Sequence, residues 1–204
     1  LDTIAASGAR AVTVSELADT LRGSGALDGL VAITFDDGLA SVAEQAAPLL
    51  AERRLPATVF AVAGRLGGWS DWPSARPGSP RLPLATGAQL RELAAAGWEI
   101  GAHGMEHAPL VRDEPGFLET ELRGSRERLE AAVEAPVRCY AYPYGALPSR
   151  AGRAAVEETY DAACTTRLAT VDPGADRWAL PRVDAHYLRG VEDVRCVLAG
   201  SLDG

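Results

Sequence analysis

The chain contains too little cysteine for several common protein classes. Cysteine occurs three times in 204 residues, at Cys139, Cys164 and Cys196. These are too few and too scattered for a disulfide framework or a zinc ribbon. We predict that all three are buried thiols, since free cysteine is among the most often buried residues. An odd, sparse count also favours a reducing compartment.

Long apolar runs and an excess of positive charge are missing as well. No stretch reaches the roughly 20 apolar residues of a membrane span, and the first thirty residues lack a basic segment followed by an apolar one. The sequence starts at Leu1 without methionine, so an upstream segment can have been removed; on the residues given we slightly favour the cytoplasm. The net charge of -8 argues against nucleic acid as a partner.

The remaining composition is that of an ordinary soluble globular protein. Hydrophobic residues make up 47% of the chain and charged residues 24%. A chain of this length can bury most of its apolar surface without disulfides or metals as staples. We expect a single domain over residues 1–204, and the sequence leaves the oligomeric state open.

Strand-like apolar runs alternate with helical patterns along most of the chain. The runs are Leu30–Phe35, Thr58–Ala63, Trp98–Ala102, Val137–Tyr142, Asp161–Thr165 and Trp178–Asp184. This alternation is typical of repeated βα units around a parallel sheet. We therefore predict an α/β fold.

Three segments between these runs have the periodicity of helices, residues 41–54, 86–97 and 117–133. In the second, Thr86 and Gln89 form a capping-box pattern, and Gly97 can close the end. In the first, Pro48 should kink or shorten the helix.

Residues 67–84 interrupt the rhythm with a long segment rich in tryptophan and proline. Loops of this length in a compact domain are often lids or binding segments. Trp69 and Trp72 can form a wall against a sugar ring. Alternatively, the two tryptophans pin the loop to the body of the protein.

Polar side chains gather where the predicted strands end. In parallel βα folds the carboxyl ends of the strands form the edge at which active sites lie. Asp36 and Asp37 follow the first run, and His103 and His107 follow the third. The others are Tyr142, Pro143, Tyr144 and Gly145 after the fourth run, and Arg182, Asp184 and His186 at the end of the last.

The first two clusters together contain the ligands of a catalytic metal site. By itself, the Asp-Asp-Gly segment is a strand-to-helix turn with a capping carboxylate, and a histidine pair is a satisfied polar pair on a helix face. However, two of the three histidines are four residues apart, as in a metal-binding pair. A catalytic ion commonly takes three protein ligands and leaves one position open for water, so the residues favour a hydrolytic site.

These motifs resemble those of the polysaccharide deacetylase family, the carbohydrate esterases of family 4 with a NodB-homology domain, in the branch that carries Tyr-Pro-Tyr-Gly. The resemblance runs from Leu27 to Asp184. It implies an irregular (β/α) barrel with about seven parallel strands. From the first motif, it implies that Asp36 is the general base and Asp37 a metal ligand.

The second and third motifs imply the rest of the site. By resemblance, His103 and His107 complete the metal triad. The backbone N–H of Tyr144 then binds the oxyanion, and Tyr142 and Pro143 lie against the substrate.

The chain also departs from the family pattern. Gly104 stands where serine or threonine is usual, and Ala141 replaces the arginine that usually orients the base. We predict that Arg182 supplies this guanidinium from a neighbouring strand. His186 is the remaining imidazole and the candidate general acid, with a surface or packing role as the alternative.

The resemblance predicts a metal-dependent hydrolase that removes an acetyl group, most readily N-acetyl, from a sugar in a glycan or a small glycoside. Zinc is the favoured ion, with cobalt, nickel and iron open, because two histidines and a carboxylate suit all four. One alternative is a glycan-binding relative that has lost its catalytic rate. Another is an amidohydrolase acting on a non-sugar C–N bond.

Overall fold

The strands of the protein form two parallel sheets in the computed structural model, which describes residues 1–23, 25–73 and 78–201. The smaller sheet pairs β1 (Arg10–Val12) with β2 (Leu30–Ala32). The larger sheet has the order β3 (Thr34–Phe35), β4 (Thr58–Ala61), β5 (Glu99–Ala102), β6 (Cys139–Ala141) and β7 (Ala162–Cys164). It curls into a half-barrel, so the predicted α/β class and the parallel, barrel-like sheet are confirmed.

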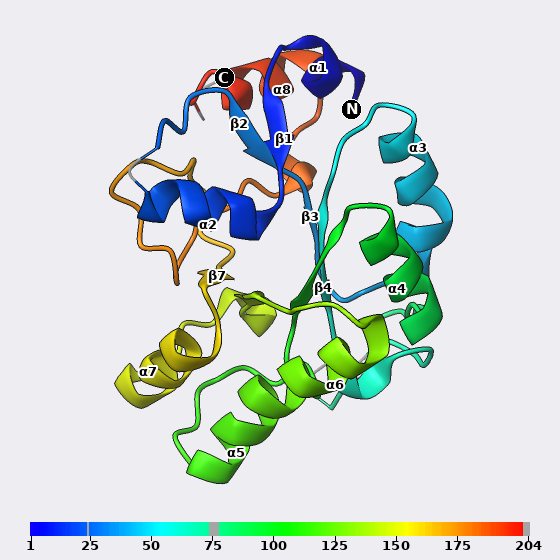
Figure 1. Ribbon diagram of the computed structural model, residues 1–204, viewed down its shortest axis with the longest axis vertical. Helices are drawn as coiled ribbons and strands as arrows, with labels where there is room; N and C mark the ends of the chain where they lie inside the picture. The colour runs from blue at the N-terminus through cyan, green and yellow to red at the C-terminus, as the bar shows by residue number, and fades with distance from the viewer. Residues whose placement is uncertain (24, 74–77, 202–204) are drawn as a thin grey trace.

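Helices surround these sheets. They are α1 (Asp2–Ala6), α2 (Val14–Arg22), α3 (Ala47–Ala51), α4 (Gly87–Ala95), α5 (Pro115–Glu119), α6 (Ser125–Val133), α7 (Arg150–Thr159) and α8 (Val191–Leu198). Short turns are the π-helical η1 (Val42–Ala46) and η3 (Thr120–Gly124) and the 3-10 turns η2 (Ala63–Arg65), η4 (Pro143–Gly145) and η5 (Ala185–Tyr187). In Figure 1, α3, α4 and α6 lie along one side of the larger sheet, and α1 meets α8 beside the smaller one. Among the described residues, no helix has the length and apolar character needed to cross a bilayer.

The core lies between the larger sheet and its helices. All residues of β4, β6 and β7 are buried, as expected for parallel strands that are covered on both faces. Phe60, Tyr140 and Leu129 belong to the fully buried set. Cys139 and Cys164 are buried as predicted, but Cys196 on α8 is only half-buried, which corrects the prediction for that residue.

The three predicted helices are present, with details that their sequences explain. The α4 capping box forms between Thr86 and Gln89, and Gly97 follows the helix at a φ of 89°. Pro48 lies in the first turn of α3, where its missing N–H costs least, and the π-helical turn η1 precedes it. The third predicted helix is built from α5, η3 and α6 in succession.

The first and last predicted strands need correction. The run 30–35 is divided at Ile33 between β2 and β3, and β2 pairs with β1, which the sequence pattern did not predict. Within the part of the chain that the structure describes, the run 178–184 contributes one isolated parallel bridge, between Leu180 and Cys164. Regular pairing ends there because the backbone N–H of Arg182 donates to the carbonyl of Arg167. The carbonyl of Thr165 instead accepts a hydrogen bond from the Arg182 side chain.

Candidate active site

Strands β3 and β5 bring the two polar clusters to one edge of the larger sheet. Both strands pair with β4 in parallel, so their carboxyl ends point the same way. Asp36 and Asp37 directly follow β3, and His103 directly follows β5. The N–H of His103 donates to the carbonyl of Ala61 at 2.9 Å, which extends the ladder up to the site.

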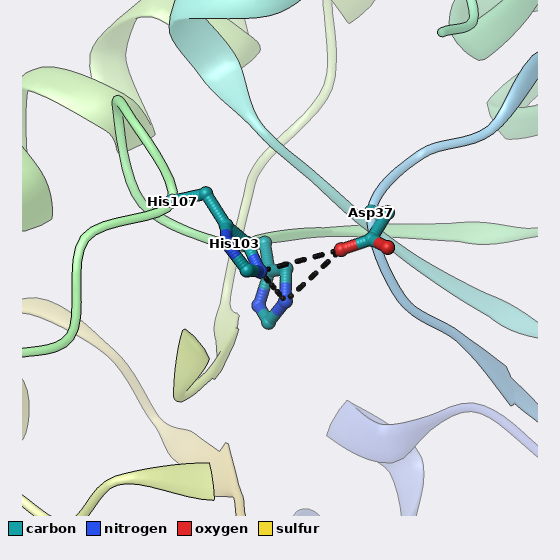
Figure 2. Close-up of side chains that lie close together, drawn as sticks. All are labelled: Asp37, His103 and His107. Atoms are coloured by element: carbon teal, nitrogen blue, oxygen red, sulfur yellow. Dashed lines mark hydrogen bonds and ion pairs between the residues drawn. The ribbon is translucent and has the colours of Figure 1, made fainter. Parts of the chain in front are cut away.

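Asp37, His103 and His107 point their ligand atoms at one another, as Figure 2 shows. The Asp37 Oδ1 lies 3.6 Å from His103 Nε2 and 3.3 Å from His107 Nε2. The two Nε2 atoms are 3.2 Å apart. Ligand atoms about 2.0–2.1 Å from a tetrahedral zinc ion are separated by about 3.3–3.4 Å. The three side chains therefore have the spacing of one face of such a site.

The environment of His103 favours a neutral imidazole that can bind a metal over a protonated one. His103 is 2% exposed, and its Nδ1 lies 2.8 Å from the carbonyl of Ala141. When Nδ1 donates this hydrogen bond, Nε2 carries the lone pair that faces the site. Burial lowers the pKa of His103, despite the nearby Asp36, so the imidazole stays neutral. Asp37 is about one-third exposed, which leaves one side of the cluster accessible.

Arg182 holds Asp36 next to this cluster. Its Nη1 and Nη2 donate to the two oxygens of Asp36 at 2.6 and 2.7 Å, and its Nη1 also lies 3.2 Å from the Thr34 hydroxyl. Burial is the largest single influence and would raise the pKa of Asp36, but the hydrogen bonds and the charge of Arg182, together with the two neighbouring imidazoles, lower that pKa on balance. Asp36 is therefore an ionised carboxylate in a fixed orientation.

Three residues around the cluster adopt the left-handed backbone conformation. Asp37, His107 and Tyr144 have φ angles of 70°, 56° and 60°. Non-glycine residues rarely adopt such angles, and each instance costs roughly 1–3 kcal/mol that the surrounding structure must offset. Arg54 and Glu134 also have such angles, so three of the five such positions among the described residues lie at the candidate site.

Comparison with known proteins identifies the family. Residues 25–163 match the family described as polysaccharide deacetylase. The chain belongs to this family. The expected family is confirmed, whereas its Tyr-Pro-Tyr-Gly branch stays a prediction.

Individual relatives within the polysaccharide deacetylases are distant. A poly-beta-1,6-N-acetyl-D-glucosamine N-deacetylase from Staphylococcus epidermidis is 25% identical over 160 residues, 74% of this chain and 53% of that protein. The chain spans about half the length of the curated relatives it matches. The structure of IcaB from Ammonifex degensii superposes with a TM-score of 0.77 at 27% identity, covering 98% of this chain and 85% of that one. The Streptococcus pyogenes deacetylase PplD in complex with acetate gives 0.75 at 21% identity, covering 89% and 76%, and supports the fold.

Aromatic residues line the site unevenly. The ring of Trp72 lies 4.3 Å from that of His107, centroid to centroid, and Trp72 is buried. The ring of Tyr144 also lies 4.7 Å from that of His107, centroid to centroid, and Tyr144 is half exposed. Trp69 is 47% exposed, with Arg81 over its ring. Trp72 is therefore packed against the body of the protein and Trp69 is half exposed, and the role of both in substrate contact stays a prediction. Residues 74–77 of this loop lie outside the described residues.

Three further predicted site residues have surroundings that do not decide their roles. Tyr142 and Pro143 are buried, and their assignment to substrate contact stays a prediction. Tyr142 donates to the carbonyl of Trp178 and supports the segment that leads to Arg182. His186 is exposed on η5 with its ring against Tyr187, and its role as general acid stays a prediction.

One buried carboxylate near the site, that of Glu121, was not predicted from the sequence. Glu121 is 3% exposed and accepts hydrogen bonds from backbone groups of the loop between the two histidines. Burial raises the pKa of Glu121, although those hydrogen bonds oppose the shift. A signal was present, because Glu121 lies between Leu118 and Leu122 on the apolar stripe of its helix.

Proposed function

We propose that the chain is a metal-dependent deacetylase that hydrolyses the N-acetyl group of an amino sugar in a glycan. One observation carries this proposal: the Asp37, His103 and His107 triangle lies beside an ionised carboxylate that no metal site requires. A binding site for an ion needs the triangle alone. A hydrolase also needs a base, and Asp36 is suited to that role.

The donor set fits one divalent ion. Asp37, His103 and His107 would hold it, with zinc favoured and cobalt, nickel or iron compatible with the same ligands. When bound, the ion would supply Lewis acidity toward a carbonyl oxygen and lower the pKa of water toward about 7. The exposed side of Asp37 leaves room for substrate.

The protein side chains provide the proton transfer and its orientation. Asp36 would accept a proton from the attacking water, which a depressed pKa permits because the carboxylate is ionised at neutral pH. Arg182 fixes the direction of both carboxylate oxygens through its bidentate contact. The family motif assigns stabilisation of the oxyanion to the backbone N–H of Tyr144, and loss of one such donor typically costs about 3 kcal/mol.

A glycan is the preferred substrate class because an exposed aromatic ring, that of Tyr144, lies beside His107 of the cluster. Trp69 and Tyr144 are about half exposed, and rings of this kind stack on sugars. The Staphylococcus epidermidis relative is named for poly-beta-1,6-N-acetyl-D-glucosamine, so N-acetylglucosamine polymers are the first substrates to test.

The decisive experiment separates an enzyme from a glycan-binding protein. Purified wild type, Asp36→Asn and Asp37→Asn are assayed for bound metal and for acetate release from β-1,6- and β-1,4-linked N-acetylglucosamine oligomers. An acetylated xylan and a cyclic amide serve as O-acetyl and non-sugar substrates. We expect wild type to bind one ion and release acetate, Asp36→Asn to bind the ion without turnover, and Asp37→Asn to lose both.

Each contrary result has a defined meaning. Equal acetate release by wild type and Asp36→Asn would refute the assignment of the base. Metal and glycan binding without acetate release from any substrate would favour the non-catalytic relative. Hydrolysis confined to the cyclic amide would favour an amidohydrolase.

A further inference from the structure

The loop that carries His103 and His107 is held by hydrogen bonds on two sides. On one side, the N–H of Ala63 donates to the Gly104 carbonyl at 3.0 Å, and the N–H of Gly64 donates to the Met105 carbonyl at 2.8 Å. Gly64 permits this approach, since a Cβ there would collide with Met105. These contacts satisfy carbonyl groups, and the N–H groups of the same loop need acceptors from elsewhere.

Glu121 supplies acceptors on the opposite side. Its Oε2 accepts from the N–H of Met105 at 2.9 Å and from the N–H of Glu106 at 3.3 Å. The carboxylate is 3% exposed and projects from the π-helical turn η3, a distortion that often occurs at functional sites. One buried oxygen therefore fixes the two residues halfway between the predicted metal ligands.

The same oxygen occupies the space beside Gly104. A Cβ at position 104 would lie 2.6 Å from Glu121 Oε2, closer than real contacts allow. Gly104 also has a φ of 81°, which disfavours a side chain. The Glu121 carboxylate and a side chain at position 104 are therefore mutually exclusive in this arrangement.

We propose that Glu121 is a positioning residue that sets the geometry of the loop between His103 and His107, and that it is coupled to the glycine at position 104. The part of this proposal that concerns metal affinity rests on the proposed function. The part that concerns the conformation of the loop does not. Glu121 does not touch the substrate. It acts through the backbone of Met105 and Glu106, which places the two imidazoles.

The test compares Glu121→Ala, Glu121→Gln, Gly104→Ser and the double variant Glu121→Ala/Gly104→Ser. Glu127→Ala is the matched control, because Glu127 is an exposed glutamate on the following helix, α6. Two quantities are measured: hydrogen exchange of the loop 103–108 in metal-free protein, and the Zn²⁺ dissociation constant by chelator competition. The first reports on the loop without any ion.

Glu121→Ala should speed exchange at Met105 and Glu106 by about tenfold or more, since the buried N–H groups lose their acceptor. It should weaken Zn²⁺ binding by about 10- to 100-fold, the usual effect of losing a group that orients ligands. Glu121→Gln keeps an acceptor oxygen, so its loop exchange and Zn²⁺ affinity should stay close to those of wild type. Gly104→Ser should speed loop exchange and weaken Zn²⁺ binding when Glu121 is present. Both effects should be smaller in the Glu121→Ala background, because the serine Cβ no longer collides with the carboxylate.

Unchanged exchange and Zn²⁺ affinity in folded Glu121→Ala would overturn the proposal, and so would strictly additive effects in the double variant. If Glu121→Ala does not fold, Glu121→Gln and Gly104→Ser test the proposal in its place. Loop exchange and Zn²⁺ affinity equal to those of wild type in Gly104→Ser would contradict the coupling. A wild-type protein that binds no Zn²⁺ defeats the proposed function instead, while the exchange measurement still tests Glu121.

Discussion

Arg182 donates hydrogen bonds to both oxygens of Asp36, at 2.6 and 2.7 Å, although 146 positions separate the two residues in the chain. The guanidinium is anchored in turn by the carbonyl of Thr165 at 2.8 Å. Ala141 occupies the position where the family usually carries this arginine, so the contact reaches the base from another segment. The contact is present, and its catalytic value is a prediction.

Arg182→Ala should lower kcat for deacetylation by about 10²-fold, at the lower end of what a positioned general base contributes. The Asp36 carboxylate would remain but lose its fixed direction. Arg182→Lys should recover little, because an ammonium group cannot make the bidentate contact. Steady-state kinetics with metal content checked in parallel measure this effect, and full activity in Arg182→Ala would show that the base needs no guanidinium.

Zinc should raise the melting temperature of the wild-type protein. At a free concentration 100 times the dissociation constant, binding contributes about 2.7 kcal/mol, which corresponds to roughly 5–10 °C for a chain of this size. A chelator should reverse the shift, and His107→Ala should abolish it. His186→Ala is the matched control, since His186 is exposed, and a lost shift in that variant would place the ion elsewhere.

Substitution of the two loop tryptophans should separate substrate binding from stability. Trp69→Ala should raise KM for glycan oligomers while changing the free energy of unfolding by less than about 0.5 kcal/mol, because the side chain is 47% exposed. Trp72→Ala should cost about 3–5 kcal/mol, because a buried indole against His107 is lost. Chemical unfolding and KM measurements on both variants test these two expectations. An unchanged KM in Trp69→Ala would exclude a contact between Trp69 and the sugar.

Asp176 should stabilise the fold in a pH-dependent way. Hydrogen bonds from Arg153, at 2.7 Å to each oxygen, lower the pKa of Asp176 in the folded state. Its contribution is therefore fully present above the unfolded pKa, near 3.8, and is lost as pH falls through the lower folded pKa.

Asp176→Asn should consequently be less stable than wild type at pH 7, by about 1 kcal/mol or less because the pair is partly exposed and screened. The two proteins should converge as pH falls below about 4. Asp28→Asn, at an exposed position, is the control for the loss of one charge. A stability difference that grows toward acid pH would contradict this assignment.

The periodicity of the sequence predicted the sheet well where strands are buried on both faces. Runs such as Thr58–Ala63 are buried on both faces and consist of apolar residues apart from Thr58, so they stand out from the turns around them. Short, partly buried strands have no comparable apolar pattern in the sequence. The strand Arg10–Val12 is three residues long and only partly buried, and its pairing with β2 depends on the tertiary fold.

The candidate site was predictable where side-chain type and spacing carry the chemistry, as for Asp37, His103 and His107. Contacts through the backbone were not predictable. Glu121 acts on main-chain N–H groups, which look alike in every sequence. Tyr142 belongs to a motif, yet only the folded chain reveals that its hydroxyl donates to the carbonyl of Trp178.

The left-handed angle of Tyr144 has a consequence for engineering of this protein. Glycine adopts a φ of 60° without the penalty of a side chain, so Tyr144→Gly would relax the backbone there. A screen for heat resistance would reward this change while removing an aromatic ring beside His107. Selection for robustness and selection for turnover therefore pull this one position in opposite directions.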